Sequence, residues 1–165
     1  MEAYTAMNHE KKYNKALCKK YPFLIPYSGR KGMEDGPIED TDYDWEYTEL
    51  DFMPRGWAKA FGMQMCDELK AELEVSGDLY RYRVLEVKEK WGELRWYDYG
   101  GNRQTEEIIE KYSRISRRTC ISCGKPAIWI TRGWISPYCD ECLPGEDGHK
   151  WQADRIEEVY REEPE

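Results

Sequence analysis

The sequence contains very little histidine and no long apolar run. Only 2 of its 165 residues are histidine, too few for a histidine–metal nuclease of the HNH kind. No apolar stretch approaches the roughly 20 residues needed to cross a bilayer, and the N-terminus lacks the basic and then apolar pattern of a signal peptide. Gly-rich phosphate loops and nucleophile elbows are also missing. We therefore expect a cytoplasmic protein with no membrane contact and no catalytic function.

Two stretches of the chain each lack one sign of charge. Residues 34–51 include nine acidic side chains and no Lys or Arg, whereas residues 111–132 include six basic side chains and no acidic one. The net charge of -8 argues against wholesale coating of nucleic acid, but it hides these two opposed patches. Because the acidic stretch also contains Gly and Pro, we expect an acidic loop at about 34–51.

Four of the six cysteines stand in two C-x2-C pairs. The pairs Cys120/Cys123 and Cys139/Cys142 are separated by 15 residues, inside the spacing expected for a zinc site. Two residues between cysteines allow one tight turn to direct both sulfurs at a single ion. Four thiolates fill a tetrahedral shell and leave no position for water or substrate, so we predict one structural zinc ion.

Other uses of these cysteines remain open. Two disulfides would suit a secreted chain, and a redox C-x-x-C needs only one pair. Iron, in a rubredoxin-like or iron–sulfur site, is also compatible with tetrahedral sulfur ligands. Cys18 and Cys66 lie on predicted helices, where we expect buried thiols rather than ligands.

Periodic apolar residues predict helices over about 9–20, 57–74 and 105–118, a hairpin over 79–99 and a short final helix over 151–161. The fold class is α+β: helices packed on a β-hairpin, followed by a C-terminal four-cysteine zinc ribbon over 120–142. We divide the chain into an α+β body (1–104) and a second part (105–165) that holds the third helix, the ribbon and the short final helix. The side chains expected on the buried faces are Tyr13, Leu17, Tyr21, Trp57, Phe61, Met65, Leu69, Leu73, Leu85, Val87, Leu94, Trp96, Ile108, Tyr112 and Ile115.

Basic residues cluster around the cysteines and the helix before them. They have two readings: a binding face for phosphate or nucleic acid, with two tryptophans for stacking, or cations that offset the -2 charge of zinc with four thiolates. The candidate binding residues are Lys111, Arg114, Arg117, Arg118, Trp129, Arg132 and Trp134, with Lys125 beside them.

An enzyme remains a further alternative. Carboxylates around Asp42 or Asp147 could hold magnesium in a nuclease, and His149 lies close to Asp147 in the sequence. No convergent motif supports this reading.

Three segments carry a family resemblance: Gly56-Trp57 before a helix, the hairpin sequence Val-Lys-Glu-Lys-Trp-Gly-Glu-Leu-Arg-Trp-Tyr at 87–97, and Ser-Arg-Arg-Thr-Cys-Ile-Ser-Cys-Gly at 116–124. In these the chain resembles small uncharacterised zinc-ribbon proteins of phages and prophages. The resemblance implies an accessory factor acting in the host cytoplasm. Our leading hypothesis is a non-enzymatic protein that binds a host protein complex, for example to inhibit a defence system. The alternatives are nucleic-acid or anion binding through the basic face and a magnesium-dependent nuclease.

Overall fold

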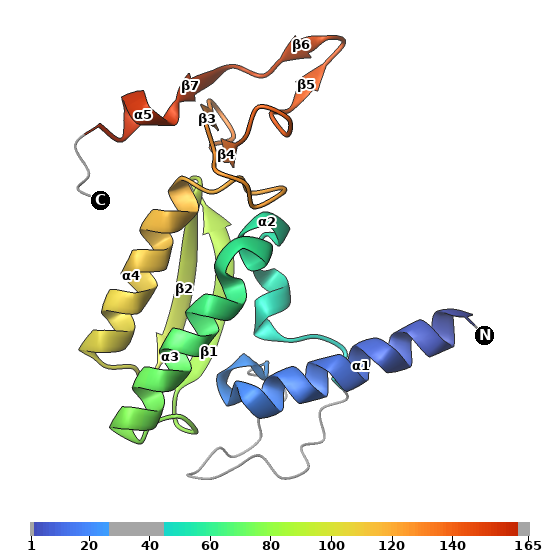
Figure 1. Cartoon of the computed structure of the whole chain (residues 1–165), viewed down its shortest axis with the longest axis vertical. Coiled ribbons are helices and arrows are strands. Elements are labelled where there is room, and N and C mark those ends of the chain that lie inside the picture. Colours follow the sequence, from blue (N-terminus) through green and yellow to red (C-terminus); the bar gives the residue numbers. More distant parts are fainter. Residues whose placement is uncertain (1, 27–44, 162–165) are drawn as a thin grey trace. The chain divides into compact units, whose positions relative to one another are not determined.

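The computed structural model of the chain describes residues 2–26 and 45–161 and consists of helices and small antiparallel sheets (Figure 1). This mixture confirms the expected α+β composition. The helices are α1 (Glu2–Lys20), η1 (Pro22–Leu24), η3 (Glu49–Phe52), α2 (Arg55–Trp57), η4 (Ala58–Gly62), α3 (Met63–Ser76), α4 (Arg103–Arg117) and α5 (Ile156–Val159). The strands are β1 (Arg83–Lys90), β2 (Glu93–Tyr99), β3 (Trp129–Thr131), β4 (Pro137–Tyr138), β5 (Gly145–Glu146), β6 (His149–Lys150) and β7 (Ala153–Arg155).

The chain divides into two compact units whose segments alternate along the sequence. The first unit contains Met1–Phe52, Cys66–Val87 and Trp96–Ile108, and the second contains Met53–Met65, Lys88–Arg95 and Ile109–Glu165. A compact unit is not in itself a domain that folds alone, so the division of the sequence into 1–104 and 105–165 stays a prediction.

The core of the first unit is aromatic. Pro22 begins the 3-10 helix η1 directly after α1, and this turn buries Phe23 and Leu24 completely. The ring of Phe23 meets that of Tyr82 edge to face at 5.6 Å, and the indole of Trp96 donates to the Tyr82 hydroxyl at 3.0 Å. A tyrosine hydroxyl buried in this way needs such a partner.

Two further cysteines lie in the same unit. Cys18 and Cys66 are fully buried, which confirms the expectation that they are buried thiols on helices. Burial raises the pKa of Cys66 to about 12, so this thiol stays protonated and unreactive at neutral pH.

The helix expected over 57–74 extends from Arg55 to Ser76, with a π-helical segment, η4, near its start. The stripe of apolar residues at a spacing of four is buried throughout, which confirms that prediction; its members are Trp57, Phe61, Met65, Leu69 and Leu73. In α1, by contrast, Tyr13 is 57% exposed and the polar Asn14 is buried, so the predicted place of Tyr13 in the stripe is wrong. Asn14 turns inward because its side-chain amide donates to the carbonyl of Trp45 at 2.9 Å.

The hairpin has the expected turn at Trp91-Gly92, and Leu94 and Trp96 are buried as predicted. On β1 the buried residues are Val84 and Val87, while Leu85 is 45% exposed. The expectation that Leu85 shares a buried face with Val87 is therefore wrong, because the alternation of inward and outward side chains is not kept along β1.

Helix α4 begins at a reciprocal cap between Asn102 and Thr105, in which each side chain accepts a hydrogen bond from the other's backbone amide. Further along, Tyr112 is buried as predicted, but Ile115 is 38% exposed. The buried face turns instead toward Ser113 and Ser116, since their hydroxyls bond the backbone of Leu94 on β2. The more general prediction that helices pack on this hairpin stays a prediction.

In the second unit, β3 pairs with β4 on one side and β7 on the other, all antiparallel. The predicted final helix is wrong at its start, because Ala153–Arg155 form β7 and only Ile156–Val159 are helical. Strand pairing with β3 overrides helix propensity there.

Two further predictions concern the acidic loop and membrane-spanning helices. The predicted acidic loop lies outside the described residues up to Asp44, and Glu49–Phe52 form η3. None of the helices in the described ranges is long and apolar enough to traverse a membrane.

Candidate metal centre

The first cysteine pair lies on a tight turn after α4. The amide of Gly124 donates to the carbonyl of Cys120 at 3.0 Å, and the amide of Cys120 donates to the carbonyl of Lys125 at 2.8 Å. Gly124 has φ +81°, a left-handed conformation that glycine adopts without steric cost. The sequence Cys-Ile-Ser-Cys-Gly thus folds back on itself and places both sulfurs on one side of the turn.

The second pair follows β4, and a similar turn closes when the amide of Leu143 donates to the carbonyl of Cys139 at 3.1 Å. The two turns meet because the amide of Ile121 donates to the carbonyl of Pro137 at 2.9 Å. The β3–β4 pair therefore brings the second turn back to the first.

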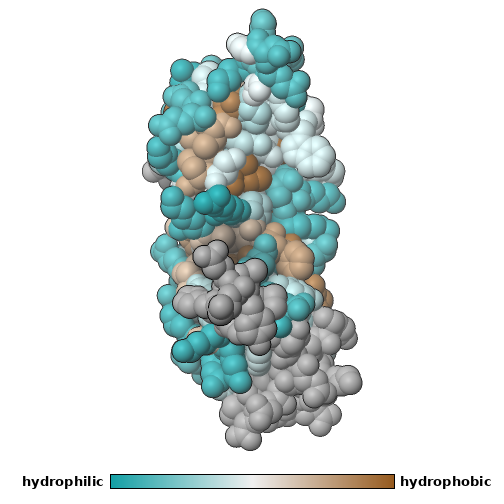
Figure 2. All heavy atoms as spheres, turned by 90° about the vertical axis from the view of Figure 1, so that its right-hand side faces the viewer, coloured by the Kyte–Doolittle hydropathy of each residue, from teal (hydrophilic) through white to brown (hydrophobic). Residues whose placement is uncertain are grey.

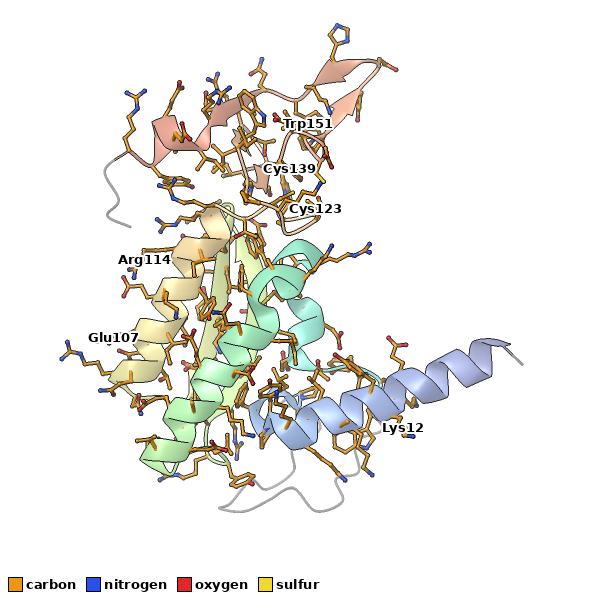
Figure 3. The ribbon with its side chains drawn as sticks, viewed as in Figure 1. Lys12, Glu107, Arg114, Cys123, Cys139 and Trp151 are labelled. Atoms are coloured by element: carbon orange, nitrogen blue, oxygen red, sulfur yellow. The ribbon has the colours of Figure 1, made fainter. Side chains whose placement is uncertain are left out.

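All four thiol sulfurs come together. The ligand atoms of Cys120, Cys123, Cys139 and Cys142 lie within 4.8 Å of one another, and the Cys123 and Cys139 sulfurs are 3.6 Å apart (Figure 3). None of the six cysteines, all of which lie within the described residues, is joined to another by a disulfide, which argues against the disulfide alternative.

The sulfur spacing fits a tetrahedral ion. A Zn–S bond of about 2.3 Å in tetrahedral geometry separates sulfurs by about 3.8 Å, close to the 3.6 Å between the Cys123 and Cys139 sulfurs and inside the 4.8 Å that bounds the whole cluster. Cys120 and Cys139 are buried and the other two cysteines are half-buried. The residues present therefore fit a closed four-thiolate site, which would supply folding free energy rather than a reactive position. Iron binds four thiolates in a similar tetrahedral geometry, so the site fits either metal.

The thiols differ in their electrostatic surroundings. Burial opposes ionisation of the Cys120 thiol, but hydrogen bonds from three backbone amides outweigh it and lower its pKa to about 7. Burial and the neighbouring sulfurs raise the pKa of Cys142 to about 12, and burial raises that of Cys139. Four sulfurs this close cannot all ionise without a cation among them.

The start of the long helical stretch docks directly on the first cysteine turn. Gly56 donates its amide to the carbonyl of Ile121 at 2.9 Å, and the buried indole of Trp57 donates to the carbonyl of Thr119 at 2.9 Å. A Cβ on Gly56 would lie 2.2 Å from the carbonyl oxygen of Cys120. Gly56 and Trp57 thus support the candidate site, a role that spacing alone does not reveal because they precede Cys120 by more than 60 residues.

Most candidate cations are neutralised within the protein. Arg114 pairs with Glu110 at 3.0 Å, and Arg117 with Glu93 at 2.9 Å. Further along, Lys125 pairs with Glu141 at 2.9 Å. The guanidinium of Arg132 forms a two-pronged contact with the carboxylate of Asp154. All four acidic partners lie outside the stretch 111–132 in the sequence. The charge of that stretch, counted from the sequence alone, therefore overstates the positive charge that is free to bind a ligand.

The remaining candidate cations contact aromatic rings. Lys111 lies over the ring of Tyr112 at 4.8 Å. Arg118 donates to the carbonyl of Tyr160 at 3.1 Å, and its guanidinium also lies over the ring of Tyr160. Both side chains reach the surface.

The two candidate tryptophans have different surroundings. The indole of Trp129 donates to Asp140 at 2.6 Å and is covered by Arg155 at 5.0 Å. Trp134, in the turn between β3 and β4, is 72% exposed. Of the two, Trp134 is the ring presented to solvent.

The residues proposed for a magnesium nuclease are not brought together. Asp42 lies outside the described residues. Asp147 and His149 lie at the exposed β5–β6 turn, where the His149 ring contacts the Asp147 carbonyl at 3.0 Å. Among the described residues, the only group of His, Cys, Asp and Glu that could hold an ion is the four cysteines.

Comparison with known proteins adds no relative: no family model, curated protein or solved structure matches this chain.

Proposed function

We propose that this chain is a non-enzymatic zinc-ribbon protein that binds another protein, with its metal ion in a structural role. The observation that carries the proposal is the closed cluster of Cys120, Cys123, Cys139 and Cys142, whose sulfurs lie within 4.8 Å of one another. Zinc held by four thiolates has no open position for chemistry. Its role here is to fix the short strands β3, β4 and β7, which are too small to hold their arrangement alone.

The charges favour a protein partner over nucleic acid. A phosphate-binding face needs several uncommitted cations, whereas Arg114, Arg117, Lys125 and Arg132 are each paired with a carboxylate. With a net charge of -8, electrostatics would oppose binding to a polyanion. Binding of nucleic acid or an anionic ligand through this face is the alternative function. Its signature is an affinity for nucleic acid that falls steeply as the salt concentration rises. If no binding is detected, or if the affinity does not change with salt, this alternative is excluded.

The resemblance of the segments around Gly56, the hairpin and the first cysteine turn leads us to propose a biological setting. In this setting the protein is an accessory factor of a phage or prophage that acts in the cytoplasm of the host. Its partner would be a host protein complex, for example one that serves in defence.

The metal is tested first. Elemental analysis of the purified protein should find one zinc ion per chain. A chelator that removes the ion should then unfold the segment that holds the four cysteines. Cys139→Ser should lose the ion, while Cys66→Ser, which changes a buried thiol outside the cluster, should keep it. Stoichiometric iron in its place would change the metal but not the closed site, and a metal-free protein with unchanged stability contradicts the proposal.

The binding function is tested by capture. The tagged, zinc-loaded chain is incubated with host lysate at moderate salt, beside the Cys139→Ser variant. A specific host protein should be retained by the wild type and lost by the variant. If no protein survives moderate salt, the proposed function is wrong.

A further inference from the structure

The turn of the β1–β2 hairpin has an unfavourable residue at its most exposed point. Trp91 and Gly92 have φ values of 54° and 78°, so both residues of this two-residue turn are left-handed. Such turns favour Asn-Gly or Gly-Gly, and a bulky aromatic residue at the first position is strained. Trp91 is also 68% exposed, so burial does not compensate for the strain. Strain of this kind, kept at an exposed aromatic residue, is typical of functional positions.

A second turn lies against the first. A Cβ on Gly92 would lie 3.3 Å from the Cγ2 atom of Ile135, so the hairpin turn contacts the turn between β3 and β4. That second turn presents Trp134, 72% exposed, and Ile135, 37% exposed. Two turns far apart in sequence are thus held together, and each presents a tryptophan.

Hydrogen bonds of one buried hydroxyl close the β3–β4 turn. The hydroxyl of Thr131 donates to the carbonyl of Trp134 at 2.5 Å and accepts the amide of Ser136 at 3.0 Å. Thr131 and Ser136 are both buried. A side chain on a turn fixed in this way loses little backbone freedom when it binds, which favours affinity.

The charge around these rings indicates the chemistry of a partner. Lys90 lies over the Trp91 ring at 4.6 Å, and among the described residues it has no carboxylate in ion-pair distance. The nearest guanidinium along the β3–β4 turn, Arg132, is bound to Asp154. The Glu89 carboxylate lies in the same turn, where it accepts the amide of Gly92 at 2.6 Å, but it is not in ion-pair distance of Lys90. The surface therefore combines two exposed indoles with a single ammonium group, and it has no set of free cations for a phosphate chain.

We propose that Lys90, Trp91, Trp134 and Ile135 form the docking surface for a protein partner that presents an apolar pocket beside a carboxylate. This inference rests on the proposed binding function and names its site. Tryptophan dominates the energetic centres of protein interfaces, where it fills such pockets. The carboxylate would pair with Lys90. On the face drawn in Figure 2, hydrophobic side chains reach the surface in small groups among hydrophilic ones.

The experiment uses a random peptide library displayed on yeast and the zinc-loaded full chain as bait. Selected peptides should be rich in aliphatic and acidic residues. Trp134→Ser should weaken their binding about tenfold or more, and Lys90→Glu should weaken it as well. The matched control is Trp151→Ser, since Trp151 is a partly exposed tryptophan outside the two turns.

Trp91→Asn separates binding from folding. Asparagine favours the turn that Trp91 strains, so this variant should unfold at a higher temperature and still bind the peptides about tenfold more weakly or worse. If peptides bind and neither tryptophan substitution changes their affinity, the proposed docking surface is wrong, although the binding function still holds. The surface is also overturned if no peptide binds more tightly than about 100 μM, if an oligothymidine 20-mer binds through the tryptophans instead, or if the wild type self-associates through them.

Discussion

The contact between Gly56 and the first cysteine turn predicts the effect of a single methyl group. In Gly56→Ala the new Cβ would lie 2.2 Å from the carbonyl oxygen of Cys120 and 2.6 Å from the carbonyl of Ile121. Both neighbours are backbone atoms, so they cannot move aside as a flexible side chain would. The cysteine turn or the start of α2 has to shift.

The magnitude follows from three opposing contributions. Alanine is favoured over glycine in a helix by at most about 1 kcal/mol. Overpacking of a filled site costs about 1–3 kcal/mol, and loss of the hydrogen bond from Gly56 to Ile121 adds about 1 kcal/mol. Unfavourable contributions prevail, and the net loss is about 1–3 kcal/mol. If the shift falls on the cysteine turn, 2 kcal/mol corresponds to about a 30-fold weaker affinity for zinc.

The assay is competition for zinc with a chromophoric chelator, together with urea unfolding of the zinc-loaded protein. Gly77→Ala is the matched control, because Gly77 has φ +80° and nothing within 4 Å of an added Cβ. It should lose some stability through backbone strain and keep its zinc affinity. A Gly56→Ala protein that is as stable as the wild type and binds zinc within about twofold refutes the reasoning.

Three further predictions follow from other contacts. Cys139→Ser should abolish zinc binding and remove hydrogen-exchange protection from the second unit, whereas Cys66→Ser should keep both. The hydrogen bond from Tyr21 holds the pKa of the exposed Asp67 below its ordinary value. The stability that the ionised Asp67 contributes is therefore present above the unfolded pKa of about 3.9 and is lost as pH falls through the folded pKa. The difference in melting temperature between wild type and Asp67→Asn should close in acid, and a difference that stays constant with pH contradicts this. Ser116→Ala removes the hydroxyl that accepts a hydrogen bond from the buried amide of Leu94 on β2. Urea unfolding should then show a loss of stability of about 1–3 kcal/mol, and an unchanged midpoint would refute the role given to this hydrogen bond.

Local patterns predicted the secondary structure where packing agreed with periodicity. The stripe from Trp57 to Leu73 is buried at every expected position. The pattern failed at Ile115 and Leu85, where hydrogen bonds of neighbouring residues or an irregular alternation along the strand decided which side chain turns inward. The final helix begins later than predicted, because residues 153–155 pair as β7 with β3, which lies more than 20 residues earlier.

The sequence by itself determined the candidate metal-ligand set and the hairpin turn. Cysteine spacing fixes which four thiols can reach one ion, and the dipeptide Trp91-Gly92 marks the turn, because both are short-range properties of the chain. Only the tertiary structure decided that Gly56 supports the cysteine turn, that Asp154 neutralises Arg132, and that Trp134 rather than Trp129 faces solvent. These are contacts between residues distant in sequence, and neither spacing nor composition records which distant groups meet.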